Sequence, residues 1–293
     1  MLEYQLLSPE EESGELYPYR RVWRSLILEM VVLLLVAAAV FIGVQLDIIE
    51  DAYSRTGNIL LALLPIGLFY VFSVRSEQRV AEPRQGLLVV LLLSVIVANG
   101  VAWTVIQEVF TPDRWLVEAG FFSRIIGYTF TLGILAEFCK YAVIRYTVWP
   151  DRFRYRLDGV AYSVPAALGY ALVVNLHFLL QDEPTISAAA IRVLVNVYLH
   201  ITVGALMGYF LAELLIGRVP FFWLPFGLFL ASFISSLFIA FRRIAVVSGL
   251  GSRDIGGLLL VLGFTVFVLG AVAFLIDSAD ERTAARAGLR RLR

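Results

Sequence analysis

The feature that most constrains this chain is a series of long apolar runs, each bounded by charged or turn-forming residues. A run of about 18 or more apolar residues is long enough to cross a hydrocarbon core of about 30 Å as a helix. Eight such spans are expected, near residues 24–46, 57–74, 86–107, 121–144, 159–180, 189–215, 219–241 and 256–277. We therefore predict an all-α, polytopic membrane bundle of about eight transmembrane helices.

The composition fits a bilayer and not a water-soluble core. Of the 293 residues, 60% are hydrophobic and only 16% are charged, whereas soluble domains contain about a quarter charged residues. The formal net charge is zero, which argues against a nucleic-acid partner. The single cysteine, Cys139, excludes an intrachain disulfide framework and a multi-cysteine metal site.

Three regions are expected along the chain. Residues 1–22 form an acidic amino-terminal tail, residues 23–278 the transmembrane bundle, and residues 279–293 a basic tail. If the amino terminus is inside, inner segments contain 16 arginines and outer loops contain 5, so the positive-inside rule predicts a cell-membrane protein with both termini in the cytoplasm. The course of the chain near residues 219–256 stays open, because the last outer loop is itself rich in arginine.

The fourth span contains an unusual charged pair. Lys140 is the only lysine in the chain, and Glu137 precedes it by three residues, so the two side chains share one helix face and can pair. Each charge near the centre of a bilayer costs at least about 2.5–3.5 kcal/mol on insertion scales. The pair is therefore either a neutralised ion pair near the inner interface or part of a polar functional site.

A polar and small-residue stripe runs down the sixth span. Its members recur every four residues, which places them on one helix face: Arg192, Asn196, His200, Gly204 and Gly208. Such a stripe can serve close helix packing, with interhelical hydrogen bonds from Asn and His. A buried His near a carboxylate is also what general acid–base catalysis or metal ligation requires.

The fifth span adds further candidates. It begins at Asp158 and Gly159, and it contains Asn175 within an apolar run. A buried amide in a membrane span requires a partner on another helix. Asn175 is therefore expected to face polar groups of a neighbouring span.

Taken in order, these elements resemble the PrsW family of intramembrane proteases. That family has a Glu-Glu-x-x-Lys motif on one span, an Asp-Gly and a Gly-Phe-Ala-x-x-Glu-Asn on the next, and a His several residues after an Arg on a later one. The corresponding pieces here are Ala136-Glu137-Phe138-Cys139-Lys140, Asp158-Gly159, Gly169 through Asn175, and Arg192 through His200. The order and approximate spacing fit across residues 120–215.

The resemblance implies cleavage of membrane-anchored proteins, with clustered carboxylates that activate water and a His that assists. Glu137 and His200 would then be catalytic, and the supporting residues would be Lys140, Asn175, Asp158, Arg192 and Asn196. Two departures weaken this chemistry, since the first Glu of the pair is Ala136 and the Glu before Asn175 is Val174.

Three hypotheses follow from these residues. The chain is a protease with a reduced site, or it keeps the family's fold without catalysis and binds a membrane-anchored protein or a partner subunit. A small transporter is the third, but it predicts matching broken helices in two repeats, which the prolines do not provide.

No cofactor is predicted, and a divalent metal at Glu137 and His200 is a weaker alternative because one carboxylate and one His make a poor ligand set. Glu137, Asn175 and His200 are expected to converge on one cavity.

Overall fold

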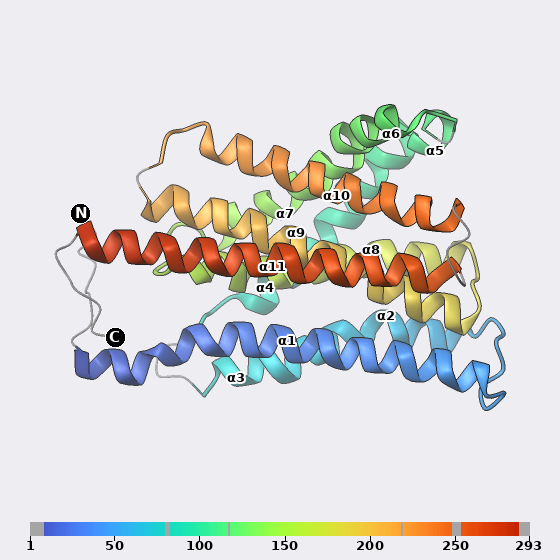
Figure 1. The fold of residues 1–293 in the computed structure, drawn as a ribbon, viewed down its shortest axis with the longest axis horizontal. Coiled ribbons are helices and arrows are strands. Elements are labelled where there is room, and N and C mark those ends of the chain that lie inside the picture. The colour runs from blue at the N-terminus through green and yellow to red at the C-terminus, as the bar shows by residue number, and fades with distance from the viewer. Residues whose placement is uncertain (1–8, 80–82, 117, 218, 248–252, 287–293) are drawn as a thin grey trace.

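The structure is a computed structural model, and it describes residues 9–79, 83–116, 118–217, 219–247 and 253–286. These residues form helices and connecting segments, and no strand occurs among them. The helices lie side by side along one long axis (Figure 1). The all-α, polytopic architecture is therefore confirmed.

Eight helical segments correspond to the eight predicted spans. Their elements are α1 (Pro9–Gln45), α2 with η1 and α3 (Arg55–Glu77), α4 with η2 and η3 (Leu87–Phe110), α6 with η4 and α7 (Phe121–Thr147), α8 (Arg156–Gln181), α9 (Ile186–Ile216), α10 (Trp223–Val247) and α11 (Arg253–Arg286). A short helix, α5 (Pro112–Trp115), precedes α6. Among the described residues, seven of these segments are long and apolar enough to cross a membrane, and the apolar stretch of α10 is shorter.

Several segments contain π-helical turns that the sequence did not predict. They are η1 (Tyr70–Val74), η2 (Ala98–Trp103), η3 (Val105–Phe110) and η4 (Thr129–Gly133). The α-helix resumes as α3 (Arg75–Glu77) after η1 and as α7 (Ile134–Thr147) after η4. A π turn inserts one residue into an α-helix, and such turns occur frequently at functional sites. Here η4 leads directly into the turn of α7 that contains Glu137.

The first and last helices extend beyond the predicted first and last spans. The first helix extends back to Pro9, and the last continues to Arg286, so parts of both predicted tails are helical; residues 1–8 and 287–293 lie outside the described residues. Long helices continue past the apolar core because each further residue adds one hydrogen bond without a new nucleus. The beginning of α1 and the end of α11 lie at the same end of the bundle (Figure 1).

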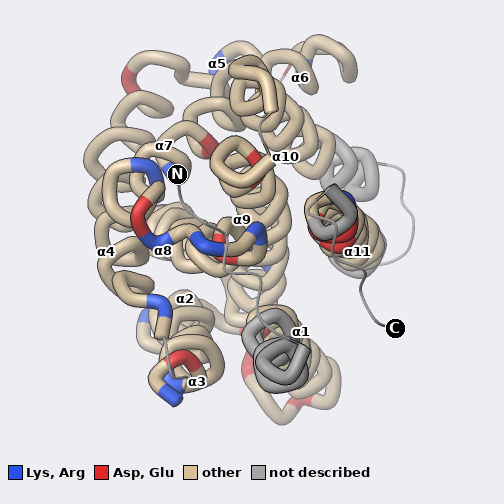
Figure 2. The backbone as a smooth tube through the Cα atoms, turned by 90° about the vertical axis from the view of Figure 1, so that its left-hand side faces the viewer, with Lys and Arg blue, Asp and Glu red and all other residues tan. Residues whose placement is uncertain are grey.

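The helix α9 is the centre of the bundle. In the view along the helices it is surrounded by α8, α10, α11, α1, α2 and α7 (Figure 2), and it packs against each of them. In its most apolar stretch 83% of residues are buried, against 28% for α1 and α11. The outer helices thus leave much of their apolar surface to the bilayer, while α8 and α9 form the protein's interior.

Glycines allow α8 and α9 to approach closely. A Cβ atom added at Gly208 would collide with the backbone of Gly159, and one at Gly159 would collide with that of Gly208. Small residues permit this kind of backbone contact between membrane helices. The polar residues on the facing sides of α8 and α9 are therefore held near one another.

Candidate functional site

Glu137 lies on α7 with its side chain wholly inside the protein. It is 0% exposed, and its Oε1 accepts a hydrogen bond from Lys140 Nζ at 2.6 Å. The two residues are one helical turn apart, as the i, i+3 spacing predicted. The lysine charge offsets the carboxylate charge in a region where an isolated ion is costly.

Tyr170 of α8 connects this pair to His200 of α9. Lys140 Nζ is 5.9 Å from the centroid of the Tyr170 ring, within the range of a cation–π contact. The Tyr170 ring also contacts His200, and the centroids of the two rings are 4.9 Å apart. His200 is 6% exposed, so residues from α7, α8 and α9 meet inside the bundle.

A second polar contact joins α8 and α9 further along. Asn196 Nδ2 donates to Asn175 Oδ1 at 2.9 Å, and both side chains are buried. This is the interhelical partner that Asn175 was expected to have. One turn from Asn196, the guanidinium carbon of Arg192 lies 4.7 Å from the centroid of the Phe178 ring.

Several of these side chains keep one buried polar atom without a partner. Within the part of the chain that the structure describes, such atoms include Glu137 Oε2, Asn175 Nδ2, Arg192 Nε and His200 Nδ1. An unsatisfied buried donor or acceptor costs about 1–3 kcal/mol. These four atoms come from α7, α8 and α9, and each marks a position where a polar ligand or water would be stabilised.

Asp158 does not join this group. It is the first-turn carboxylate of α8, and its Oδ2 accepts from the backbone N–H groups of Arg154 and Tyr155 at 2.8 Å each. Twelve residues separate it from Tyr170, which is about 18 Å along the helix. Its other oxygen, Oδ1, accepts from Arg84 Nε at 2.7 Å, so it stabilises the end of the bundle.

The family model described as PrsW family intramembrane metalloprotease matches residues 82–271 of this sequence, well over half of the chain. The chain belongs to the PrsW family. The match begins between α3 and α4 and ends within α11, so it includes every residue of the candidate site.

Curated PrsW proteases are similar over shorter stretches. Protease PrsW of Oceanobacillus iheyensis is 29% identical over 97 residues, which are 33% of this chain and 44% of that protein. Protease PrsW of Bacillus subtilis is 29% identical over 82 residues, which are 28% of this chain and 37% of that protein. Protease PrsW of Geobacillus kaustophilus is 31% identical over 81 residues, which are 27% of this chain and 35% of that protein. The chain thus matches less than half the length of these relatives. No solved structure matches it.

The family description raises the question of a metal. A catalytic zinc typically has three protein ligands from His, Cys or carboxylate side chains. Among the described residues no group of three or more such side chains could hold a metal ion. The candidate site offers Glu137, with one oxygen on Lys140, and His200. This donor set does not fit a catalytic metal.

The structure shows contacts of Tyr170 and Arg156 that the sequence had not indicated. Tyr170, the aromatic link between Lys140 and His200, lies within the Gly169-to-Asn175 motif, but nothing in the sequence shows which face of α8 it is on. Arg156 forms an ion pair with Glu213 and a second one, at 2.6 Å, with Asp280. Its role was hidden because its partners are 57 and 124 residues away.

Proposed function

We propose that this PrsW-family membrane protein binds a membrane-anchored protein at its buried polar site and does not hydrolyse it. The observation that carries the proposal is an apolar cluster at the positions where the family has its other carboxylates. Ala136, Cys139, Tyr170 and Val173 pack together there with Ala98 and Ala102, and Val174 packs against them.

The chemistry of peptide hydrolysis explains why this cluster matters. A water molecule attacks a peptide carbonyl only when a general base accepts its proton. The family pattern supplies several carboxylates for this purpose, whereas Glu137 is the only one left here. Its Oε1 already accepts a hydrogen bond from Lys140, so only its Oε2 remains to take a proton from water.

The unpartnered atoms support binding. Arg192 Nε and Asn175 Nδ2 are donors, Glu137 Oε2 is an acceptor, and His200 Nδ1 can be either, depending on its tautomer. Together they complement the N–H and C=O groups of a peptide backbone. A membrane-anchored segment that locally unwinds would expose such groups, and they are costly in lipid unless they find partners.

A second function is favoured by one specific observation. Glu137 and His200 are both buried, and the Lys140 that pairs with Glu137 lies against the same tyrosine ring as His200. One Glu and one His form a minimal acid–base pair. The alternative is therefore a protease with a reduced site, in which Glu137 is the base and His200 its partner.

We further propose that the protein lies in the cell membrane with both termini in the cytoplasm. The 16-to-5 distribution of arginines supports this orientation. It would place the end of the bundle that holds Asp158, Arg156 and Glu213 on the cytoplasmic side.

Photo-crosslinking tests the binding function. A photoreactive amino acid at Phe138, 51% exposed beside Glu137, should capture a membrane-anchored protein at its full length. The same probe at Phe267 on α11, 70% exposed, is the matched lipid-facing control and should not capture it. Asn175→Leu should abolish the Phe138 adduct. Equal adducts at both positions, or an adduct to a shortened partner, would contradict the proposal.

A further inference from the structure

A second buried carboxylate lies far from the site described above. Glu29 of α1 is 4% exposed and precedes the region that the family model matches. It is seven residues into the apolar part of α1 that begins at Val22, about 10 Å along the helix. Its Oε1 accepts a hydrogen bond from Ser73 Oγ, and its Oε2 has no partner among the described residues.

Two small cavities lie next to the contact between Glu29 and Ser73, since Glu29 lines one and Ser73 lines the other. The one beside Glu29 has a volume of about 10 Å³ and is otherwise lined by apolar side chains: Met30, Leu33, Pro65, Leu68, Leu168, Val197 and Ile201. The other has about 20 Å³. A water molecule requires roughly 10–15 Å³ on this scale, so the spaces suit one water molecule and one or two, respectively.

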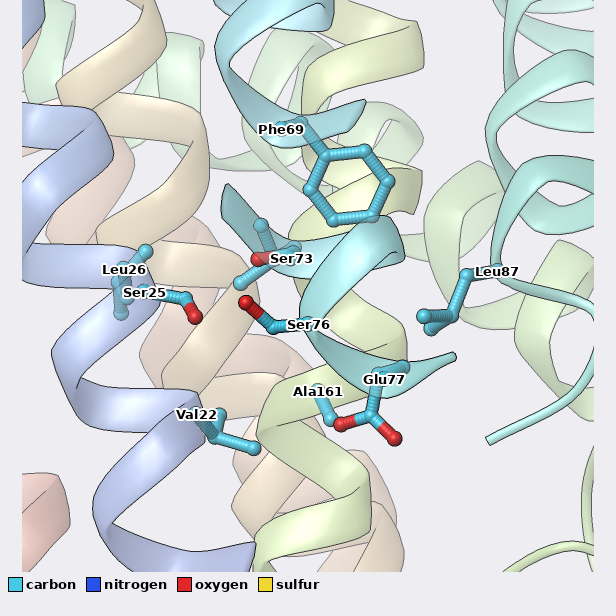
Figure 3. A pocket seen from close by; sticks show the side chains of 10 residues that line it. Val22, Ser25, Leu26, Phe69, Ser73, Ser76, Glu77, Leu87 and Ala161 are labelled. Atoms are coloured by element: carbon cyan, nitrogen blue, oxygen red, sulfur yellow. The ribbon is translucent and has the colours of Figure 1, made fainter. Parts of the chain in front are cut away.

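The larger cavity has a polar wall (Figure 3). The hydroxyl groups of Ser25, Ser73 and Ser76 point toward one another, and the carboxylate of Glu77 lies below them. Ser25 Oγ also donates to the carbonyl oxygen of Phe72 at 2.9 Å. Ser73 belongs to η1, a π-helical turn of the kind that is common at functional sites. It lines the larger cavity and bonds to Glu29, and so it links the two spaces.

Glu77 connects this column of polar groups to the end of the bundle. Its Oε1 accepts from Arg84 Nη1 at 2.6 Å, and Arg84 also bonds to Asp158. Burial disfavours the charge of Arg84, but the two carboxylates outweigh this effect and raise its pKa. Arg84 lies between two spans, so the column begins at one membrane face and ends at Glu29.

The groups around Glu29 favour a proton over a metal cation. Among the side chains that the structure describes, no lysine or arginine lines either cavity. From α9 the titratable group on this side is Tyr198, whose hydroxyl donates to the carbonyl oxygen of Met30. From α3 and α8 the charged groups are Glu77 and Asp158, at the far end of the column. A sodium ion would need several further oxygen ligands, which the apolar lining beside Glu29 does not supply.

We propose that Glu29 is a proton-binding site inside the membrane, supplied from one membrane face through water held between Ser25, Ser73, Ser76 and Glu77. A proton neutralises a buried carboxylate that has no counter-charge. The neutral acid can accept from Ser73 at one oxygen and donate to a water molecule at the other. This inference is independent of the function proposed for Glu137 and His200.

Infrared spectroscopy of the full chain in lipid nanodiscs tests the site. A carboxylic acid C=O stretch should titrate with pH in the wild type and be absent in Glu29→Gln. Ser73→Ala should keep the band but move it to higher frequency, because the acid loses a hydrogen bond. Glu213→Gln is the control, since Glu213 is ion-paired with Arg156, and it should leave the band unchanged.

Exchange into D₂O tests the route. Ala161→Leu would fill the larger cavity, which Ala161 lines, and should slow deuteration of the Glu29 band several-fold; Ser76→Val is the second variant if the first does not fold. Identical spectra for the wild type and Glu29→Gln would overturn the proton site, and so would loss of the band on addition of sodium ions alone. Unchanged deuteration in the folded variant would overturn the route.

Discussion

Two groups of buried polar side chains differ in how completely they are paired. At the end of the bundle, Arg156 forms ion pairs with Glu213 and Asp280 and donates to Thr283, while Arg84 pairs with Glu77 and Asp158. In the candidate site on α7, α8 and α9, each of four side chains keeps a polar atom without a partner among the described residues. Buried polar groups whose hydrogen bonds are all formed stabilise a fold, whereas groups with missing hydrogen bonds lower its stability unless a ligand supplies them. The contrast separates scaffold from site.

Breaking the fully paired group around Arg156 should have the largest effect on stability. Arg156→Met leaves the buried Glu213 and the partly exposed Asp280 without this cation, which should lower the free energy of unfolding by about 3 kcal/mol. Unfolding by denaturant in detergent micelles measures the loss. Arg282→Met is the control, because Arg282 is exposed and donates to the carbonyl oxygen of Ser278 on its own helix. A loss no larger than the control's would mean that the network is not part of the scaffold.

The glycine contact between α8 and α9 should come next. Gly208→Ala places a methyl group against the backbone of Gly159, and overpacking of this kind costs typically about 1–3 kcal/mol. The matched control is Gly263→Ala on α11, where an added Cβ meets nothing within 4 Å. That control should leave stability unchanged or raise it slightly, since alanine favours the helix. Equal effects of the two changes would contradict the close approach.

Replacing a site residue should cost less. His200→Leu removes a buried ring nitrogen that has no partner among the described residues, so stability should change by less than about 1 kcal/mol in either direction. The same unfolding measurement applies, together with loss of the Phe138 adduct. A loss as large as that of Arg156→Met would place His200 in the scaffold and remove the contrast between the two groups.

The smallest effect is expected in the loop before α2. The slight desolvation of the exposed Asp51 opposes its ionisation, but hydrogen bonds from the Ser187 hydroxyl and backbone, and from Thr185, outweigh this effect and hold the pKa of Asp51 below its usual 3.8. A lowered pKa means that this contribution is present above pH about 4 and is lost as the pH falls through the folded-state value.

Asp51→Asn should therefore cost less than about 1 kcal/mol at pH 7, because the contact is exposed. Stability measured between pH 7 and pH 3 should fall slightly more steeply in the wild type than in the variant. Parallel curves would show that Asp51 does not anchor the start of α9.

The sequence predicted more of the fold than of the site. Apolar run lengths reflect membrane thickness, so the eight helical segments could be located from them. Helical periodicity also placed Glu137 beside Lys140, because both lie on one helix. Contacts between helices depend on rotation and packing, and these are not encoded locally; the link through Tyr170 and the pairing of Arg156 with Asp280 were therefore invisible. The π turns shift the face of the helix on which each following residue lies, and this makes contacts between helices still harder to predict from the sequence.

The most direct test of the central claim, that the site binds without cleaving, is a comparison of membrane-protein termini by mass spectrometry. Cells would carry the wild type or Glu137→Gln, with both proteins folded and equally abundant, and a variant with Ala136→Glu and Val174→Glu as the check for restored hydrolysis. If the site only binds, the termini are identical in cells with the wild type and with Glu137→Gln. A membrane-protein terminus that appears with the wild type and disappears with Glu137→Gln would contradict it and establish Glu137 as a catalytic base.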